Sequence, residues 1–357
     1  MKITVVDADR LGSEQVALWS EIQRANPSLA SPYFRPEYVR AVASVRKGVA
    51  VGILEEAGRT VGFFPFQHGR WKIGRPVGTP LCDFQGVVTP PGTPFDAEEL
   101  IRGCGLATWR FDQLLADQQP FGRFHRTAAP AAFLDLSRGF EAYYEDLRQR
   151  SSREVSRIRY RRRAAERRVG AVRFDFHTAD SCVFEKLLQW KAAQYVRTGH
   201  TNILQFAWVA ELLRRIRRHQ DEAFAGVLSA LYLGDRLAAV HLGMRSYKVL
   251  HRWFPAYDPE LRQHSPGRIL LIELARAAAA RGIRRIDDSK GLEQDKTSVM
   301  SGSVAVADGS VTCGRLRRAL EHARQGTQRV AEVPLLGGPA RRAARLSRPL
   351  RRWLAFR

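Results

Sequence analysis

The sequence has few cysteines and lysines and no long apolar run. It contains four cysteines in 357 residues, and none lies in a C-x-x-C pair, so it predicts neither a zinc site nor a disulfide framework. No run of about 18 apolar residues is present, which is the minimum that a membrane-spanning helix needs. The first residues also lack the apolar segment of a secretory signal. We therefore expect a cytoplasmic protein without a metal site, at most peripheral to the inner face of the membrane.

Acidic residues are scarce relative to basic ones. Lysine and arginine together number 58 against 36 aspartates and glutamates, which gives a net charge of +22, and only eight of the basic residues are lysines. A balance of this kind favours contact with polyanions such as nucleic acid, anionic lipid headgroups or phosphorylated substrates. The alternative is a basic, solvated surface without a partner. The 45% of apolar residues is typical of a folded chain, and the length predicts two lobes.

The pattern of strands and helices repeats along the chain. In residues 1–138 it predicts a strand, two helices, a hairpin, a further strand at 84–89, a helix, and later strands that include 123–127 and 132–136. Residues 171–314 repeat this order, with a hairpin turning at Gly234-Asp235. We therefore expect an α+β (mixed α/β) fold of two tandem lobes, each a mixed sheet flanked by helices.

A basic helix is expected between the lobes, at residues 139–170. Residues 147–168 hold ten arginines and two glutamates, spaced so that an arginine stripe runs along an exposed face. The helix from Arg148 to Arg168 is thus a candidate contact for RNA, or for an anionic membrane surface or glycolipid pyrophosphate. A solvated face is the alternative. Residues 315–357, with twelve arginines and two glutamates, are expected to be a mobile basic tail.

One loop indicates an anion site. After a strand at 249–254, Ser265 is an expected N-cap, Pro266 suits the first helical position, and Gly282 ends the helix. The N-terminus of a helix that follows a strand presents free N–H groups and a positive dipole, which can hold a pyrophosphate. Arg262 and Arg268 would add positive charge. The alternative is a well-capped amphipathic helix without a ligand.

The same loop resembles a known motif. The spacing Arg262-x-x-Ser265-x-Gly267 is similar to the Arg/Gln-x-x-Gly-x-Gly/Ala pyrophosphate loop of GNAT acyltransferases, with Ser265 replacing the first glycine. Segments 187–191, 198–200, 228–232 and 251–259 add a resemblance to the CelD/BcsL-type acetyltransferases of that superfamily, which are related to the two-lobed Fem-type aminoacyltransferases. A weaker likeness in the first lobe covers residues 80–86.

The resemblance implies a donor and an acceptor. It implies acetyl-CoA or another acyl-CoA as co-substrate, no metal, and an acceptor that is a small molecule or a glycan precursor of the cell envelope or a polysaccharide. Two alternatives stay open, namely a Fem-like transferase that uses aminoacyl-tRNA and a non-catalytic GNAT fold that binds polyanions. The residues that would hold the cofactor are Arg262, Ser265, Pro266, Gly267 and Arg268.

The catalytic candidates are titratable groups near the expected sheet edge. A base must take a proton from the acceptor, and a histidine is suited to this at neutral pH. The predicted catalytic residues are His251, His241, Asp287 and Tyr257, where Tyr257 would donate to the leaving thiolate. For each histidine the alternative is a buried imidazole satisfied by a neighbour, and for Asp287 it is a cap of the following turn.

The substrate-binding candidates come from both lobes. Trp190 and Lys191 lie on one predicted helix, where Trp190 is either a stacking platform or a core anchor. Asp83 follows a Gly-Thr-Pro-Leu turn and either faces the cleft between the lobes or caps that turn. Lys290 and Lys296 are expected just beyond the last strand of the second lobe.

Overall fold

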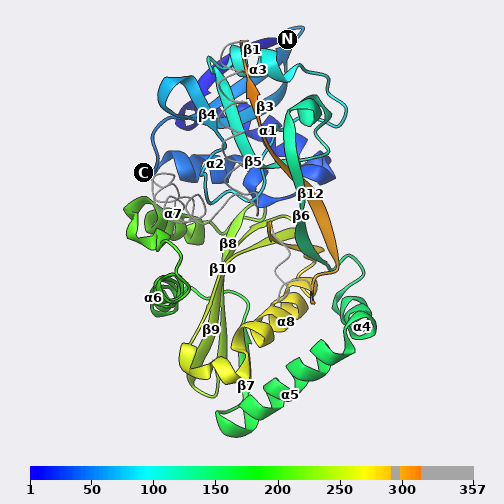
Figure 1. The fold of residues 1–357 in the computed structure, drawn as a ribbon, viewed down its shortest axis with the longest axis vertical. Coiled ribbons are helices and arrows are strands. Elements are labelled where there is room, and N and C mark those ends of the chain that lie inside the picture. The colour runs from blue at the N-terminus through cyan, green and yellow to red at the C-terminus, as the bar shows by residue number, and fades with distance from the viewer. Residues whose placement is uncertain (291–297, 315–357) are drawn as a thin grey trace, which may run out of the picture.

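The computed structural model describes residues 1–290 and 298–314. All twelve strands of the described chain form one sheet, in the order β1-β2-β3-β4-β5-β12-β6-β11-β10-β9-β8-β7. Helices cover its faces, and α6 and α7 lie on the other side of the second lobe's strands from α8 and α5 (Figure 1). The expected mixed α/β fold of two lobes, each a sheet flanked by helices, is confirmed.

The two lobes share one order of elements. In each, a strand is followed by two helices, three antiparallel strands, a helix and a strand parallel to the one before it. In the first lobe these are β1 (Lys2–Asp7), α1 (Ser13–Ala25), α2 (Pro36–Ala43), β2 (Val49–Glu56), β3 (Arg59–His68), β4 (Ile73–Arg75), α3 (Ala97–Gly103) and β5 (Thr108–Leu115). In the second they are β7 (Val172–Asp175), α6 (Ser181–Arg197), α7 (Ala207–Arg218), β8 (Ala225–Leu233), β9 (Arg236–Ser246), β10 (Val249–Tyr257), α8 (Pro266–Ala279) and β11 (Arg285–Lys290). The expected duplication is therefore present.

The remaining two strands are exchanged between the lobes. Strand β6 (His125–Asp135) follows β5 in the chain but pairs with β11 of the second lobe. Strand β12 (Gly302–Thr312) follows β11 but pairs with β5 of the first lobe. The two exchanged strands also pair with each other, from Gly302 opposite Phe133 to Gly309 opposite His125. The expected second lobe, 171–314, includes residues 302–312, although these complete the sheet of the first lobe. The lobe boundaries at 138 and 171 stay a prediction.

Each lobe contains a parallel strand pair that separates after a short contact. Strands β10 and β11 pair at only three positions, which end where His251 faces Asp287. Beyond this point β10 carries a bulge between Arg252 and Phe254 and pairs with β9 alone. In the first lobe β4 and β5 pair at only two positions. Such a separation opens the sheet between two neighbouring strands without disturbing the rest of it.

The basic segment forms two helices rather than one. Helix α4 (Phe140–Arg150) ends at Ser151, and α5 (Ser152–Arg168) begins directly after it. Serine competes for backbone hydrogen bonds and so favours helix ends, which explains the break in the expected continuous helix. Helix α5 buries Val155, Ile158 and Ala165 and lies along the outer edge of the second lobe (Figure 1).

Two local predictions for the first lobe are wrong. Residues 84–89 form no strand and make only isolated bridges, Gln85 with Leu114 and Val88 with Phe63. The two strands expected at 123–127 and 132–136 are one strand, β6, because pairing along β12 keeps the segment between them extended. The expected tail, 315–357, lies outside the described residues.

The described chain offers no membrane span and no metal cluster. In residues 1–290 and 298–314, no helix has both the length and the apolar character needed to cross a bilayer. The same residues contain no group of three or more histidine, cysteine, aspartate or glutamate side chains placed to hold a metal ion.

Candidate active site

A cavity of about 470 Å³ lies at the start of α8. The loop before α8 and its first turn form one wall, β9 and the separated part of β10 form another, and α5 closes it from outside. All five residues predicted to hold the cofactor line this cavity, together with Tyr257. The cavity also contains four polar residues that were not assigned to it from the sequence, namely Arg157, Arg161, Gln194 and Arg252.

Ser265 precedes α8 in a left-handed conformation, with φ of +54° and ψ of +50°. Ser265 is the N-cap of α8, as expected, but its side chain makes no capping hydrogen bond, and its carbonyl accepts from the N–H of Arg268. A side chain in this backbone region is strained, whereas glycine adopts it freely. This explains why a glycine occupies the corresponding position of the motif that the loop resembles.

The first turn of α8 is open toward the cavity. At Gly267 the nearest atom to an added Cβ would be the Cδ1 of Tyr257, 3.7 Å away. The positive end of the α8 dipole lies at this turn, although the N–H groups of Arg268 and Ile269 already donate to the Ser265 carbonyl. The cavity is therefore suited to an anion of the size of a pyrophosphate.

The arginines of the cavity outnumber the carboxylates that contact them. Asp288 binds Arg252 through both guanidinium nitrogens that face it. Glu154 is buried beneath the cavity and contacts Arg157, and its other oxygen lies 3.6 Å from Arg268. Five arginines line the cavity, so they outnumber the carboxylates that contact them in residues 1–290 and 298–314.

A histidine and an aspartate from different lobes meet on the other face of the sheet. Nε2 of His251, on β10, lies 2.9 Å from Oδ2 of Asp83, and the His251 side chain is fully buried while that of Asp83 is 15% exposed. Side chains alternate along a strand, and Arg252 lines the cavity at α8, so His251 points the opposite way. The prediction that Asp83 faces the space between the lobes is supported by this contact.

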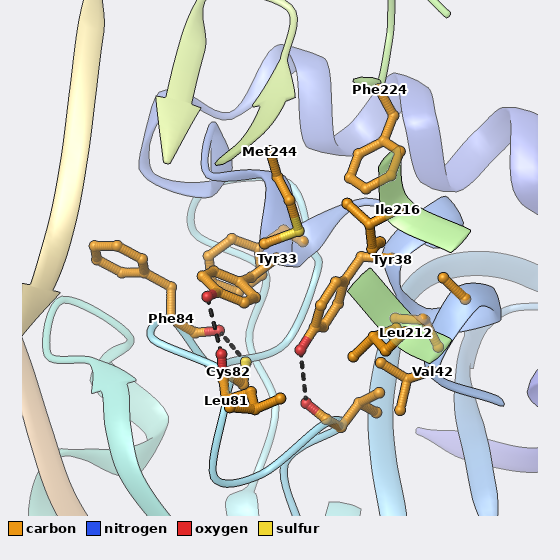
Figure 2. Packing of buried hydrophobic residues seen from close by; sticks show 14 of the residues in the cluster. Tyr33, Tyr38, Val42, Leu81, Cys82, Phe84, Leu212, Ile216, Phe224 and Met244 are labelled. Carbon is orange, nitrogen blue, oxygen red and sulfur yellow. Dashed lines mark hydrogen bonds between the residues drawn. The ribbon is translucent and has the colours of Figure 1, made fainter. Parts of the chain in front are cut away.

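Asp83 is held in place by residues of its own lobe. Nε2 of Gln113, on β5, donates to Oδ1 of Asp83 at 3.0 Å. The hydroxyl of Tyr33 donates to the Leu81 carbonyl at 2.9 Å (Figure 2). The same hydroxyl oxygen lies 3.5 Å from Oδ2 of Asp83. Burial and the Asp83 charge raise the pKa of Tyr33, which therefore keeps its proton. Asp83 is thus fixed from both sides, not merely capping a turn.

His251 has one nitrogen without a partner. Because a carboxylate only accepts hydrogen bonds, we assign the imidazole hydrogen to Nε2, next to Asp83. Nδ1 then carries the lone pair, and it has no hydrogen-bond partner among the described residues. The ring of Tyr33 packs edge-on against the imidazole, with 4.9 Å between centroids. This combination of an oriented ring and a free lone pair is what a general base requires.

Asp287 lies beside His251 but makes a different contact. Its carboxylate is fully buried, and its Oδ1 lies 2.7 Å from Nε of Arg285. Burial raises the pKa of Asp287, while the positive charge of Arg285 opposes this shift. Asp287 lies at the last paired position of β10 and β11. It forms an ion pair with Arg285, whereas Asp83 contacts His251.

His241 is buried without a hydrogen-bond partner. It faces Pro255 across the β9–β10 ladder, and neither of its ring nitrogens has a partner in the described structure. Burial, together with the charges of Arg252 and His251, lowers the pKa of His241 to about 3. His241 is thus a neutral side chain at neutral pH, unsuited to accept a proton.

The other substrate candidates fall in separate places. Trp190 is partly buried and packs on the main hydrophobic core, as its anchor interpretation expects. Nζ of Lys191 donates to the Pro255 carbonyl at 3.1 Å, which ties α6 to the separated part of β10. Lys290 ends β11, where it pairs with Ala131, and Lys296 lies outside the described residues.

Sequence reasoning missed the residues that position Asp83. Gln113 and Tyr33 are 30 and 50 positions from it in the chain, and no local motif connects them. Trp253 was also missed, although its Nε1 donates to the Leu81 carbonyl at 3.2 Å and ties the bulge of β10 to the first lobe. The only sequence signal was the likeness at residues 80–86.

Comparisons with known proteins agree with this geometry. Residues 150–297 match the family described as "Acetyltransferase (GNAT) domain". The fold is similar to a crystal structure of FemX, with a TM-score of 0.58 and 8% identity over 90% of this chain and 99% of that one. It is also similar to the C-terminal domain of a putative lysylphosphatidylglycerol synthetase from Agrobacterium fabrum, with a TM-score of 0.51 and 14% identity over 87% and 95% of the chains. The comparison with curated protein sequences found no match.

The matched domain and the two-lobed fold define the class of the protein. It carries a GNAT acetyltransferase domain, and it is an acyltransferase. The CelD/BcsL subtype stays a prediction.

We predict that Ser265→Gly stabilises the protein. Glycine removes the left-handed strain of about 1 kcal/mol, of which part is offset by the greater freedom of the unfolded chain. A matched control is Ser156→Gly in the exposed part of α5, which should cost about 0.5 kcal/mol because glycine disfavours helix. Urea unfolding of both variants measures the effect. A loss of stability at position 265 equal to that at position 156 would contradict the strain.

We predict that His241 contributes to acid sensitivity. Its pKa is about 3 when folded and near 6.5 when unfolded, so the unfolded state binds the proton first. Stability from this group is complete above pH 6.5 and decreases as the pH falls below it, by about 2 kcal/mol at pH 5. His241→Asn should therefore lose less stability between pH 7.5 and 5 than the wild type, as measured by urea unfolding. His200→Asn, at an exposed position, is the control, and equal losses in all three proteins would refute the prediction.

Proposed function

We propose that the protein is an acyl-CoA-dependent N- or O-acyltransferase whose donor occupies the cavity at α8. The observation that carries this proposal is the junction of that cavity with the gap between β10 and β11. The pyrophosphate would lie against the first turn of α8, near Arg262 and Arg268, and the thioester would reach the gap past Pro255 and Ala256.

The acceptor would approach from the face that carries His251 and Asp83. Its nitrogen or oxygen attacks the carbonyl carbon of the thioester, the C–S bond breaks, and CoA leaves as the thiolate. The acceptor's proton passes to Nδ1 of His251, and Asp83 stabilises the resulting imidazolium through Nε2–H. Backbone N–H groups of β10 beyond His251 are not paired with β11, so they are available to the oxyanion. Tyr257, which lines the cavity at α8, would protonate the thiolate.

The acceptor class is a small molecule or a glycan precursor of a polysaccharide or the cell envelope. Support comes from the resemblance of segments 187–191 and 251–259 to enzymes of that group. The partly buried carboxylate of Asp83 suits an acceptor with N–H or O–H donors.

We expect CoA and acetyl-CoA to raise the melting temperature, because a ligand that binds only the native state stabilises it. Gly267→Glu should abolish this shift, since its carboxylate would repel the pyrophosphate at a position where a side chain has room. Gly267→Gln is the matched neutral control and should retain part of the shift. If no thioester shifts the wild type, the acyl-CoA proposal is wrong.

We expect His251→Gln to lower kcat of acetyl transfer by roughly 10²–10⁴-fold, the usual contribution of a general base. Asp83→Asn should also lower kcat, with less effect on KM for acetyl-CoA, because Asp83 does not line the donor cavity. Release of free thiol from acetyl-CoA reports the rate, and the exposed His200→Gln is the control. A His251→Gln enzyme with wild-type kcat would exclude His251 as the base.

A second candidate is a transferase that uses aminoacyl-tRNA. The observation in its favour is the outer face of α5, where Arg153, Arg163 and Arg167 form no ion pair with any described residue and Tyr160 is 64% exposed. Arginines that flank an exposed aromatic ring suit a phosphate backbone with a stacked base.

Replacing Arg153, Arg163 and Arg167 together by glutamine tests this candidate. If tRNA is the donor, binding of tRNA in a filter assay and transfer from aminoacyl-tRNA should both fall, while the melting temperature stays unchanged. Loss of binding to anionic vesicles alone would assign the face to a membrane surface. An unchanged affinity for both would leave it as a solvated face and exclude the second candidate.

A further inference from the structure

The donor cavity has more cationic side chains than a pyrophosphate needs. The loop and first turn of α8 supply Arg262, Arg268 and the positive end of the helix dipole. Two further arginines, Arg157 and Arg161, reach the cavity from α5, which contacts the loop segment 259–264. The motif that the loop resembles does not account for these two side chains.

Arg157 and Arg161 lie on one face of α5. Residues four apart in a helix are neighbours, with about 6 Å between their Cβ atoms. A guanidinium nitrogen of Arg161 donates to the carbonyl of Gln263, so α5 is attached to the loop that contains Arg262. Arg157 contacts Glu154 and is otherwise exposed. The two guanidiniums thus form a second basic subsite beside the loop.

The balance of charge shows what this subsite can hold. Among the described residues, two carboxylates, Glu154 and Asp288, form ion pairs with arginines of the cavity, and five arginines line it. Within the described part of the chain, the arginines of the cavity thus exceed these carboxylates by three, in addition to the dipole of α8. A pyrophosphate diester carries about two negative charges, so a donor without another phosphate leaves guanidinium charge uncompensated.

We propose that Arg157 and Arg161 bind a terminal phosphate of the donor, the 3′-phosphate of CoA. The inference rests on the proposed function, because it concerns the same cavity and the same donor. A phosphate monoester presents several oxygens to two guanidiniums, an arrangement that arginine binds better than other side chains. The subsite thereby selects a complete CoA thioester over donors that carry only the phosphopantetheine arm or the dephosphorylated nucleotide.

The test compares CoA with 3′-dephospho-CoA by isothermal titration calorimetry. The wild type should bind CoA at least about 10-fold more tightly, as expected for charged hydrogen bonds to one phosphate. Arg157→Gln and Arg161→Gln should each weaken CoA binding while leaving the affinity for dephospho-CoA nearly unchanged. Arg159→Gln is the matched control, since Arg159 lies on the far side of α5 and lines a different cavity. Melting temperatures establish that each variant is folded. If Arg161→Gln is not folded, because Arg161 also holds the loop through the Gln263 carbonyl, Arg157→Gln alone carries the test.

Each outcome is decisive. Equal affinities of the wild type for the two ligands would overturn the inference and leave the proposed function standing. Failure of both ligands to bind would overturn the proposed function and this inference with it. Equal losses for CoA and dephospho-CoA in Arg157→Gln and Arg161→Gln would show that these arginines do not read the 3′-phosphate.

Discussion

The pairing of β6 with β12 is the interaction on which the rest of the structure depends. Each of these strands follows one lobe in the chain and completes the sheet of the other, and their mutual ladder joins both sheets into one. Lobes joined only by a linker are free to move relative to each other. Here the backbone hydrogen bonds of the exchanged strands fix the lobes, so that a loop of the first can be held against a strand of the second.

The two lobes differ at the place where their parallel strands separate. In the second lobe the gap between β10 and β11 stays open toward the α8 cavity. In the first lobe Gln85 bonds along β5, with its N–H on the Gln113 carbonyl and its own carbonyl on the Leu115 N–H, and so occupies the region beyond the β4–β5 contact. The corresponding helix, α3, has seven residues, and its first turn begins with Asp96, Glu98 and Glu99. An acidic helix start repels a pyrophosphate. The first lobe supplies Asp83, just before Gln85, to the contact with His251 of the second lobe.

Much of this arrangement could be predicted from the sequence, and the limits have physical causes. The hairpin around Gly234-Asp235 and the helix after Pro266 depend on local turn and capping chemistry, so their patterns are visible in short segments. The left-handed conformation of Ser265 could not be predicted in this way, because it depends on how the loop joins β10 to α8. The exchange of β6 and β12 was missed because strand partners far apart in the chain leave no local signal. For the same reason His251 and Asp83 were separate candidates, and neither predicted the other.

The central claim is that a CoA thioester lies against the first turn of α8 and enters the gap between β10 and β11. Hydrogen–deuterium exchange of the full chain with and without acetyl-CoA tests this claim most directly. The account predicts slower exchange at Gly267–Ile269 and at 252–257, with no change at α3, the equivalent helix of the first lobe. Protection at α3, or no protection at the start of α8 under saturating acetyl-CoA, would contradict it.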